Sequence, residues 1–428
     1  MTVGKVHIIG AGLAGLSAAV ELASSGVAVV IHEAAKHAGG RCRSYHDQKL
    51  QMEIDNGNHL LLSSNAYALR YLDAIGAADR VSRLPDAHFP FVDVTANARW
   101  TIAPSAGPLP LWLLSPDRRV PDAHLRDYLN LLRLLWTAGD QPVADVMSCK
   151  GPLYRKFMRP LLLAALNTDP AEASSALARQ LMRDTLMKGA KACKPIIAQE
   201  GLSRAFIEPA LTVIEKRQGK LHLGTRLRDI PIAQDRATAL RFEDHTIPLA
   251  PSDIVILAVP PQIAACLAPG VTTPDAFNAI VNIHFAIQAP SNLAPITGIV
   301  GAMSEWLFAY PGRLAVTISA ANRLLETPVE KLATETWREV AMIAGINSPL
   351  PPWRVLRERR ATFAATPEQN GKRPRARTAI PNIILAGDWT ATGLPATIEG
   401  AIKSGVTAAR EAQALSHKGM MEALADHG

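Results

Sequence analysis

The chain has 428 residues, which at roughly 150 residues per domain predicts two or three domains with a sizeable core. Apolar residues make up 48% of it and charged residues 19%, a composition that excludes a wholly disordered protein. The net charge of +7 permits attraction to anionic lipid or nucleic acid, but aromatic residues are only 5% and the basic residues are scattered, so nucleic-acid binding is not expected.

The first 33 residues have the pattern of a strand, a tight turn, a helix and a second strand. Strand-like composition covers 5–9 and 27–32, the turn covers 10–15, and helical composition covers 16–24. The glycines of the turn Gly10-Ala11-Gly12-Leu13-Ala14-Gly15 let the backbone approach a pyrophosphate at a helix N-terminus. Glu33 ends the second strand where an acid accepts hydrogen bonds from ribose hydroxyls and repels a 2′-phosphate. These features predict a dinucleotide-binding βαβ unit.

A first insertion runs from about residue 84 to 199, and its most marked feature is a leucine-rich segment at 125–136. The apolar residues recur every three or four positions and nearly encircle the expected helix. We favour a helix that is buried in a second domain. The alternative is an interfacial helix that contacts lipid, with Arg126 and Arg133 near the headgroups.

Two later apolar runs, 253–259 and 382–386, are typical of buried parallel strands whose carboxyl ends meet loops. Because these runs lie far from the first strand, we expect a discontinuous, Rossmann-like α/β domain with an inserted α+β substrate domain. The predicted division is 1–83, 200–275 and 372–415 for the dinucleotide-binding domain, 84–199 and 276–371 for the substrate-binding domain, and 416–428 for a tail.

No metal site, disulfide framework or membrane-spanning helix is expected. The four cysteines lie far apart without CxxC or CxxH spacing, which is typical of a cytosolic protein. No apolar run reaches the 18 or so residues that a spanning helix needs.

Two further elements favour a flavin over a nicotinamide cofactor. Gly39-Gly40-Arg41 follows Glu33, and Leu385-Ala386-Gly387-Asp388 lies near the C-terminus. Both resemble elements of the FAD enzymes of the amine oxidase and carotenoid desaturase superfamily. The resemblance implies that Arg41 pairs with the pyrophosphate and that Asp388 binds a ribityl hydroxyl. It also implies that a helix begins at Ile398 beneath the flavin, where its N-terminal amides stabilise negative charge.

Four blocks narrow the resemblance: 55–62, 160–168, 359–364 and 387–401. Together they resemble the hydroxysqualene dehydroxylases, FAD-dependent enzymes of bacterial hopanoid pathways, over nearly the whole chain. The resemblance implies that hydroxysqualene, a C30 allylic alcohol, is reduced to squalene, and that an electron donor of unknown identity reduces the FAD. An amine substrate is disfavoured, because Trp389 is the one aromatic residue between Gly387 and Gly400, where an amine oxidase would place two.

The expected site residues follow from these motifs and from the resemblance. The cofactor-binding set is Gly10, Gly12, Leu13, Ala14, Gly15, Glu33, Gly39, Gly40, Arg41, Gly57, Asn58, Leu227, Gly387, Asp388, Thr397 and Ile398. Leu227 is expected to offer backbone groups to the adenine. The departing hydroxyl needs a general acid, for which His59 is the first candidate, although a structural role beside the cofactor is an equal alternative. Asn167 is expected to orient the hydroxyl.

The implied substrate predicts a long apolar tunnel, with 161–166, 281–287 and 306–308 as candidate walls, although each segment is equally consistent with ordinary protein core. We also expect peripheral contact with the cytoplasmic face of the inner membrane, because the substrate is insoluble and no spanning helix is predicted. Two other functions remain open: an FAD-dependent isoprenoid or carotenoid desaturase that works in the oxidative direction, and a non-catalytic isoprenoid carrier on the same fold.

Overall fold

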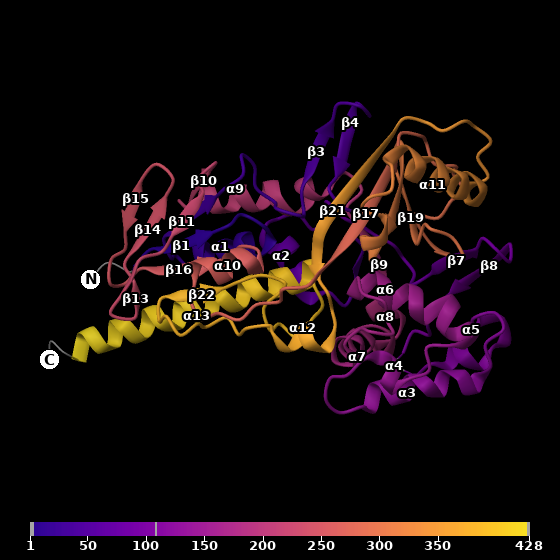
Figure 1. The fold of residues 1–428 in the computed structure, drawn as a ribbon, viewed down its shortest axis with the longest axis horizontal. Coiled ribbons are helices and arrows are strands. Elements are labelled where there is room, and N and C mark those ends of the chain that lie inside the picture. Colours follow the sequence, from indigo (N-terminus) through magenta and orange to yellow (C-terminus); the bar gives the residue numbers. More distant parts are fainter. Residues whose placement is uncertain (1–3, 108, 426–428) are drawn as a thin grey trace.

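A five-stranded parallel sheet forms one end of the molecule in the computed structural model, which describes residues 4–107 and 109–425 (Figure 1). Its strands, in spatial order, are β10 (Lys220–Leu223), β2 (Val29–Glu33), β1 (Val6–Ile9), β16 (Ile254–Leu257) and β22 (Ile383–Leu385). The two apolar runs predicted as parallel strands are therefore β16 and β22. The sheet is assembled from segments that are far apart in the sequence.

One face of the parallel sheet is covered by α1 (Leu13–Ser24) and α13 (Ile398–Ala425), which pack closely against each other. A Cβ on Gly405 would lie 2.2 Å from the Ala14 carbonyl oxygen, so a glycine is needed where the two helices cross. Helix α13 continues without a break to Ala425, so the predicted boundary at 416 falls within this helix, and the separation of 416–428 as a tail stays a prediction. Two further helices, α2 (Ala66–Ala74) and α9 (Glu208–Lys216), complete this layer.

The other face of the parallel sheet carries a small antiparallel sheet, which buries a separate set of apolar side chains. Its strands are β11 (Leu227–Asp229), β14 (Ala239–Phe242) and β15 (Thr246–Pro248). Phe242 reaches the parallel sheet and packs on His32, with ring centroids 4.7 Å apart. Helix α10 (Pro261–Leu267) follows β16 at its carboxyl end.

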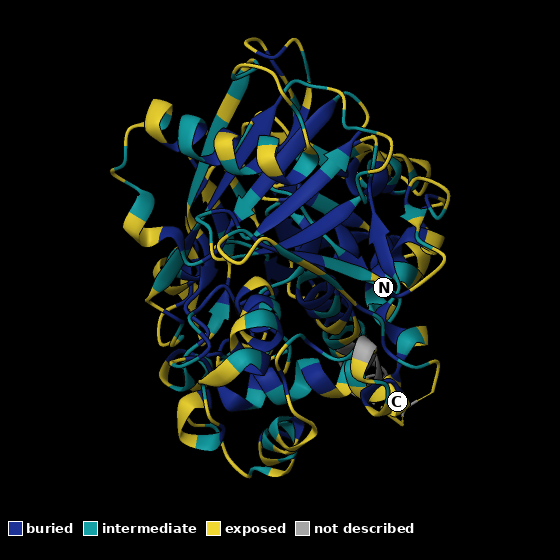
Figure 2. Cartoon of the chain, turned by 90° about the vertical axis from the view of Figure 1, so that its right-hand side faces the viewer, coloured by how far each residue is buried: buried dark blue, intermediate teal, exposed yellow. Residues whose placement is uncertain are grey.

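A seven-stranded sheet forms the second half of the molecule. Its spatial order is β21 (Trp353–Phe363), β17 (Phe277–Phe285), β20 (Arg313–Ile318), β19 (Trp306–Tyr310), β18 (Ile296–Val300), β7 (Phe89–Asp93) and β8 (Ala98–Ile102). Strand β7 pairs with β18 in parallel, so both predicted insertions contribute to one sheet. Figure 2 shows these central strands as mostly buried beneath more exposed helices and loops.

Helix α11 (Val329–Ala344) covers one face of the seven-stranded sheet, where it packs on Val281, Ile283 and Phe285 of β17. The expectation that 281–287 forms an apolar tunnel wall is therefore wrong. Side chains alternate along a strand, so the apolar side of β17 faces α11, and Asn282 and His284 point to the opposite face. Trp306 and Phe308 of β19 belong to the same hydrophobic core cluster as Leu162 and Leu166, and their predicted role as tunnel walls stays a prediction.

Helices from the first insertion cover the opposite face of this sheet (Figure 1). They are α3 (Leu129–Trp136), α4 (Val143–Val146), α5 (Gly151–Leu153), α6 (Arg159–Leu166), α7 (Ser175–Asp184) and α8 (Ala190–Cys193). The segment 125–136 begins with a 3₁₀ turn and continues as α3, but the favoured interpretation as a buried helix is wrong. Leu125, Leu129 and Trp136 are exposed. Among the described residues, no helix combines the length and apolarity that crossing a bilayer requires.

Candidate functional site

The glycine turn between β1 and α1 is shaped by close backbone contacts. A Cβ on Gly15 would lie 2.0 Å from the Gly10 carbonyl oxygen, and one on Gly10 would lie 2.4 Å from that of Ala258. A Cβ on Gly12 would meet no atom within 4 Å. Gly10 and Gly15 therefore fit the turn against its neighbours, and Gly12 leaves open space at the start of α1. That helix has no side-chain cap, so its first-turn amides, including those of Leu13 and Ala14, remain available to an anion.

The Gly39-Gly40-Arg41 element packs directly on this turn. The Gly39 amide donates to the Ala11 carbonyl at 2.8 Å, and a Cβ on Gly40 would lie 3.4 Å from Cα of Gly12. Both glycines have positive φ, at 108° and 55°, a region that other residues rarely adopt. The two glycine elements thus form one backbone cradle, which has the donors and the open space that a pyrophosphate requires.

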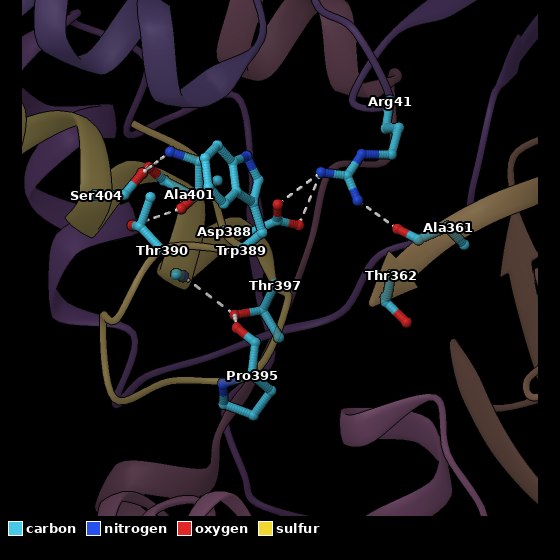
Figure 3. A network of polar contacts seen from close by, with 12 residues as sticks. Arg41, Ala361, Thr362, Asp388, Trp389, Thr390, Pro395, Thr397, Ala401 and Ser404 are labelled. Carbon is cyan, nitrogen blue, oxygen red and sulfur yellow. Dashed lines mark hydrogen bonds and ion pairs between the residues drawn. The ribbon is translucent and has the colours of Figure 1, made fainter. Parts of the chain in front are cut away.

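Arg41 joins this cradle to the second predicted flavin element, as Figure 3 shows. Its guanidinium donates to both carboxylate oxygens of Asp388 at 2.8 Å, and it also donates to the Ala361 carbonyl of β21. The charge of Asp388 raises the pKa of Arg41. Asp388 is nearly buried and Arg41 is about half exposed, so the arginine can reach a ligand while it remains near its partner. The predicted pairing of Arg41 with a phosphate and of Asp388 with a ribityl hydroxyl remains a proposal.

Glycine at 387 is required by the indole of Trp389. A Cβ there would lie 2.2 Å from the Trp389 ring nitrogen, and Gly387 itself has φ 154°. Trp389 is buried and donates to the Val259 carbonyl at 2.9 Å, so it wedges the loop against β16. Its ring is therefore occupied in packing and is unavailable as a wall of an amine-binding cage.

Arg373 is a functional candidate that the sequence analysis missed. Its guanidinium donates to the Asp388 carbonyl at 3.1 Å and to the Thr392 hydroxyl at 2.9 Å, and it lies over the ring of Phe363. Its Nε is buried without a hydrogen-bond partner among the described residues. Burial lowers the pKa of Arg373 to about 10. In the sequence it is one of several basic residues at 372–377, and nothing there distinguishes the buried one.

The start of α13 is held by two side chains. The Thr397 hydroxyl accepts from the Gly400 amide at 3.1 Å and so caps the helix. The carboxylate of Glu399 accepts from the amides of Tyr67 and Ala68 at the start of α2. Burial raises the pKa of Glu399. The predicted contacts of Thr397 and Ile398 with a flavin remain a proposal, and the capping by Thr397 explains why the helix begins there.

Glu33 and Leu227 lie beside each other at the edge of the cradle. The carboxylate of Glu33 accepts from the amides of Ala11 and Ala35 at 2.7 and 2.8 Å. The Thr225 amide donates to the Glu33 carbonyl at 2.8 Å, which brings the start of β11, and with it Leu227, to the end of β2. This arrangement supports the proposed adenosine end of the cofactor site.

The loop 55–59 lies between the cradle and the seven-stranded sheet. Asp55 is buried, accepts from the Leu202 amide at 2.8 Å and pairs with Arg313 at 3.3 Å, so it anchors the loop. Asn58 donates to Asn282 at 3.2 Å and to Thr317 at 3.1 Å. A Cβ on Gly57 would lie 3.5 Å from Nε2 of His59.

His59 itself is half-buried, and its ring makes no hydrogen bond with any described residue. Burial lowers its pKa to about 4; the charge of Asp55 opposes this shift and that of Arg41 adds to it. The ring is therefore neutral at pH 7 in this structure. The ring nitrogens are free to bond a ligand beside the cradle. This geometry leaves both predicted roles of His59 as predictions.

Asn167 has a structural role that conflicts with the one predicted. It ends α6 with φ 48°, and its side chain is buried. Its amide nitrogen donates to the Asn278 carbonyl at 3.2 Å and to the Thr362 hydroxyl at 3.0 Å, and its oxygen accepts from the Ala320 amide at 2.7 Å. Both amide hydrogens are used within the protein, so the structure does not support Asn167 as the residue that orients a substrate hydroxyl.

Comparisons with known proteins agree with this geometry. Residues 13–413 match the model of the flavin containing amine oxidoreductase family. The chain is 50% identical over 405 residues to the hydroxysqualene dehydroxylase of Sinorhizobium fredii, covering 95% of this chain and 97% of that one. It is 45% identical to the hydroxysqualene dehydroxylase of Zymomonas mobilis, covering 96% and 99%.

Solved structures with low sequence identity share the fold. A putative protoporphyrinogen oxidase from Exiguobacterium sp. 255-15 superposes with a TM-score of 0.70 at 15% identity, covering 98% of this chain and 100% of that one. Cyclohexylamine oxidase from Brevibacterium oxydans superposes with a TM-score of 0.71 at 14% identity, covering 97% and 99%.

Proposed function

The chain belongs to the hydroxysqualene dehydroxylases within the flavin containing amine oxidoreductase family, and we propose that it reduces hydroxysqualene to squalene with FAD as its cofactor. The observation that carries this proposal is the 50% identity over nearly the whole of both chains. The cradle supports it, because Gly12 leaves room for a pyrophosphate and the helix start leaves its amides free. Trp389 is the one aromatic residue within 387–400, and its occupation in packing argues against an amine-binding cage built by this loop.

When bound in reduced form, FAD would supply the hydride chemistry by which the hydroxyl group is replaced. The chain must then hold the allylic carbon in place, exclude water and deliver a proton to the departing oxygen. The cluster that contains Leu162, Leu166, Trp306 and Phe308 supplies apolar surface for the hydrocarbon. Of the three predicted walls, these parts of 161–166 and 306–308 remain in the proposal.

His59 is the proposed proton donor at the oxygen. Its ring lies in the loop 55–59 beside Arg41 of the cradle, and the ring nitrogens make no hydrogen bond with a described residue. With a pKa of about 4, roughly one ring in a thousand carries a proton at pH 7. The step should therefore become faster as the pH falls from 7 toward 4.

The test is anaerobic single turnover, in which dithionite-reduced protein is mixed with hydroxysqualene and flavin reoxidation is followed by absorbance. We expect squalene as the product, and His59→Gln should slow reoxidation at least ~10²-fold while FAD remains bound. His88→Gln, an exposed histidine, is the control and should react at the normal rate. Full-rate reaction of His59→Gln per bound flavin would remove His59 from the mechanism. Failure of the unmodified protein to form squalene would contradict the function itself.

Two features of the proposal concern partners and location. The FAD must receive electrons from a donor. We place the protein on the cytoplasmic face of the inner membrane as a peripheral protein, because the C30 substrate partitions into lipid and the net charge is +7.

A further inference from the structure

Exposed large apolar side chains concentrate in one part of the molecule. Eleven such residues are found among the described residues, and six of them lie within 109–136. A seventh, Met187, follows α7. We call these seven the apolar surface: Leu109, Leu111, Leu114, Leu125, Leu129, Trp136 and Met187. Scattered single residues need no explanation, but a cluster of this kind marks an interaction site.

Short-range contacts bring the three segments of the apolar surface together. Ser105 accepts from the Ala190 amide through its carbonyl and from the Trp112 amide through its hydroxyl, both at 2.8 Å. These bonds join the 3₁₀ turn at Leu111–Leu114 to the segment that holds Met187. Arg183 of α7 donates to the Leu135 carbonyl at 3.0 Å, which joins the same segment to the end of α3. The region lies at the lower right of Figure 1, around α3 and α7.

The exposed side chains are the outer side of a well-packed layer. Trp112 and Tyr128 are buried with their rings edge to face, and their ring centroids are 5.9 Å apart. Leu134 and Leu135 are buried on the inner side of α3. On the outer side, Leu129 and Trp136 are 61% and 77% exposed and are two helical turns apart, so they project from one face of the helix. The apolar residues of this helix therefore divide between a buried inner side and an exposed outer side.

The charges around the apolar surface are mostly positive. Five basic side chains are exposed in and beside its segments: Arg118, Arg126, Arg133, Arg183 and Lys188. Of the described acidic side chains in 109–136 and 181–190, Asp122 is exposed, and its carboxylate is paired with Lys156 at 2.7 Å. Asp184 pairs with Lys188 at 3.1 Å, so the four arginines carry most of the free positive charge. A cationic rim around apolar residues, with an exposed tryptophan, matches the headgroup region of an anionic bilayer.

We propose that this apolar surface docks the protein on an anionic bilayer, with Leu125, Leu129 and Trp136 inserted among the acyl chains and Arg126 and Arg133 at the headgroups. The proposal deepens the peripheral location of the proposed function, on which it rests, by naming the surface and the lipid charge. Besides the leucine-rich segment, the proposed docking surface includes the turn at 109–114 and Met187.

Vesicle flotation tests the proposal on the FAD-loaded protein. We expect binding to vesicles of phosphatidylcholine with phosphatidylglycerol, and much weaker binding to phosphatidylcholine alone or at high salt. Leu129→Ser and Trp136→Ser should each reduce the partition coefficient about tenfold, because each removes an apolar side chain that the proposal inserts into the bilayer. Arg126→Glu with Arg133→Glu should abolish the preference for phosphatidylglycerol. Met342→Ser, an exposed apolar residue on α11, is the matched control and should bind normally.

A second measurement locates the surface directly. Trp136→Phe should keep vesicle binding but lose most of the fluorescence quenching that brominated lipids cause in the unmodified protein. Absence of vesicle binding, or equal loss in Met342→Ser, would overturn the proposal. So would a dimer that Leu129→Ser converts to monomer without any vesicle affinity, since that result assigns the surface to a second copy of the chain. Squalene formation in detergent micelles is measured in parallel, so a failure of docking is distinguished from a failure of the proposed function.

Discussion

The parallel sheet and the seven-stranded sheet build their parts of the site in different ways. At the parallel sheet, the cradle is made of backbone: glycine turns at 10–15 and 39–40 lie against each other with almost no side chain between them. At the seven-stranded sheet, the face turned to the loop 55–59 carries side chains, among them Asn282, which bonds Asn58. A backbone site needs particular residues at fixed spacing, whereas a side-chain site needs strands in a particular register.

The largest effects are expected from alanine substitutions in the backbone site, one of which should reduce folding stability and the other FAD affinity. Gly15→Ala should destabilise the protein by several kcal/mol, because its Cβ would lie 2.0 Å from the Gly10 carbonyl oxygen. Gly12→Ala should leave the melting temperature of the FAD-free protein within a few degrees, because its Cβ meets no atom within 4 Å. Its FAD affinity should nevertheless fall at least ~100-fold, because the methyl group occupies the space that the pyrophosphate needs.

Thermal melting of the FAD-free protein and titration with FAD measure both parts. Normal FAD affinity in Gly12→Ala would show that the pyrophosphate lies elsewhere. A stable Gly15→Ala would show that the turn tolerates a shift of the Gly10 carbonyl, and the contrast between the two glycines would then be lost.

A smaller effect is expected where a side chain completes the backbone site. Asp388→Ala should weaken FAD binding about 10- to 100-fold, the equivalent of roughly 1.5–3 kcal/mol for a hydrogen bond to a charged group. Asp388→Asn should lose less, because it retains one acceptor oxygen. Asp275→Ala removes an exposed partner of Lys372 and serves as the control, with no change in FAD affinity. Equilibrium titration by flavin fluorescence measures all three, and unchanged affinity in Asp388→Ala would mean that the ribityl site is misplaced.

The same contrast explains what the sequence could predict. The cradle residues and the strands β16 and β22 were predictable, because glycines, an acid at a strand end and apolar runs each have a local cause. Asn167 was not, because its partners lie more than a hundred residues away, and the inner face of β17 was not, because it depends on which face of the strand turns inward. Arg373 was not, because its role depends on how the loop after it folds back to bring Asp388 and Thr392, 15 and 19 residues further on, to its guanidinium. For the leucine-rich helix, composition could not show which apolar side chains face the protein interior and which are exposed.

Three histidines are an exception to this contrast, because they place polar side chains on the parallel sheet. His7, His32 and His222 lie on neighbouring strands, with centroids 5.7 Å apart for the first pair and 5.3 Å for the second. His7 and His32 are buried, and the Nδ1 atom of His32 has no hydrogen-bond partner among the described residues. Burial, and to a smaller extent the neighbouring histidines, lowers the pKa of His32 to about 3. Burial also lowers the pKa of His7, which the charge of Asp253 partly offsets.

The smallest expected effect is therefore a sensitivity to acid that originates in the sheet. In the unfolded chain His32 titrates near 6.5, whereas in the folded protein it stays neutral to about pH 3, so the unfolded state binds the extra proton as the pH falls below 6.5. Stability is fully present above that pH and is lost toward pH 3, by roughly 2 kcal/mol at pH 5 for His32 alone. His32→Leu should reduce the difference in melting temperature between pH 7.5 and pH 5, and His88→Leu, an exposed control, should not. Part of the pH dependence should remain, because the pKa values of His7, His59 and His284 are lowered as well. If His32→Leu keeps the full pH dependence, the histidines of the parallel sheet do not set the acid limit. The acid sensitivity would then originate in the seven-stranded sheet, where His284 is buried beside Arg313.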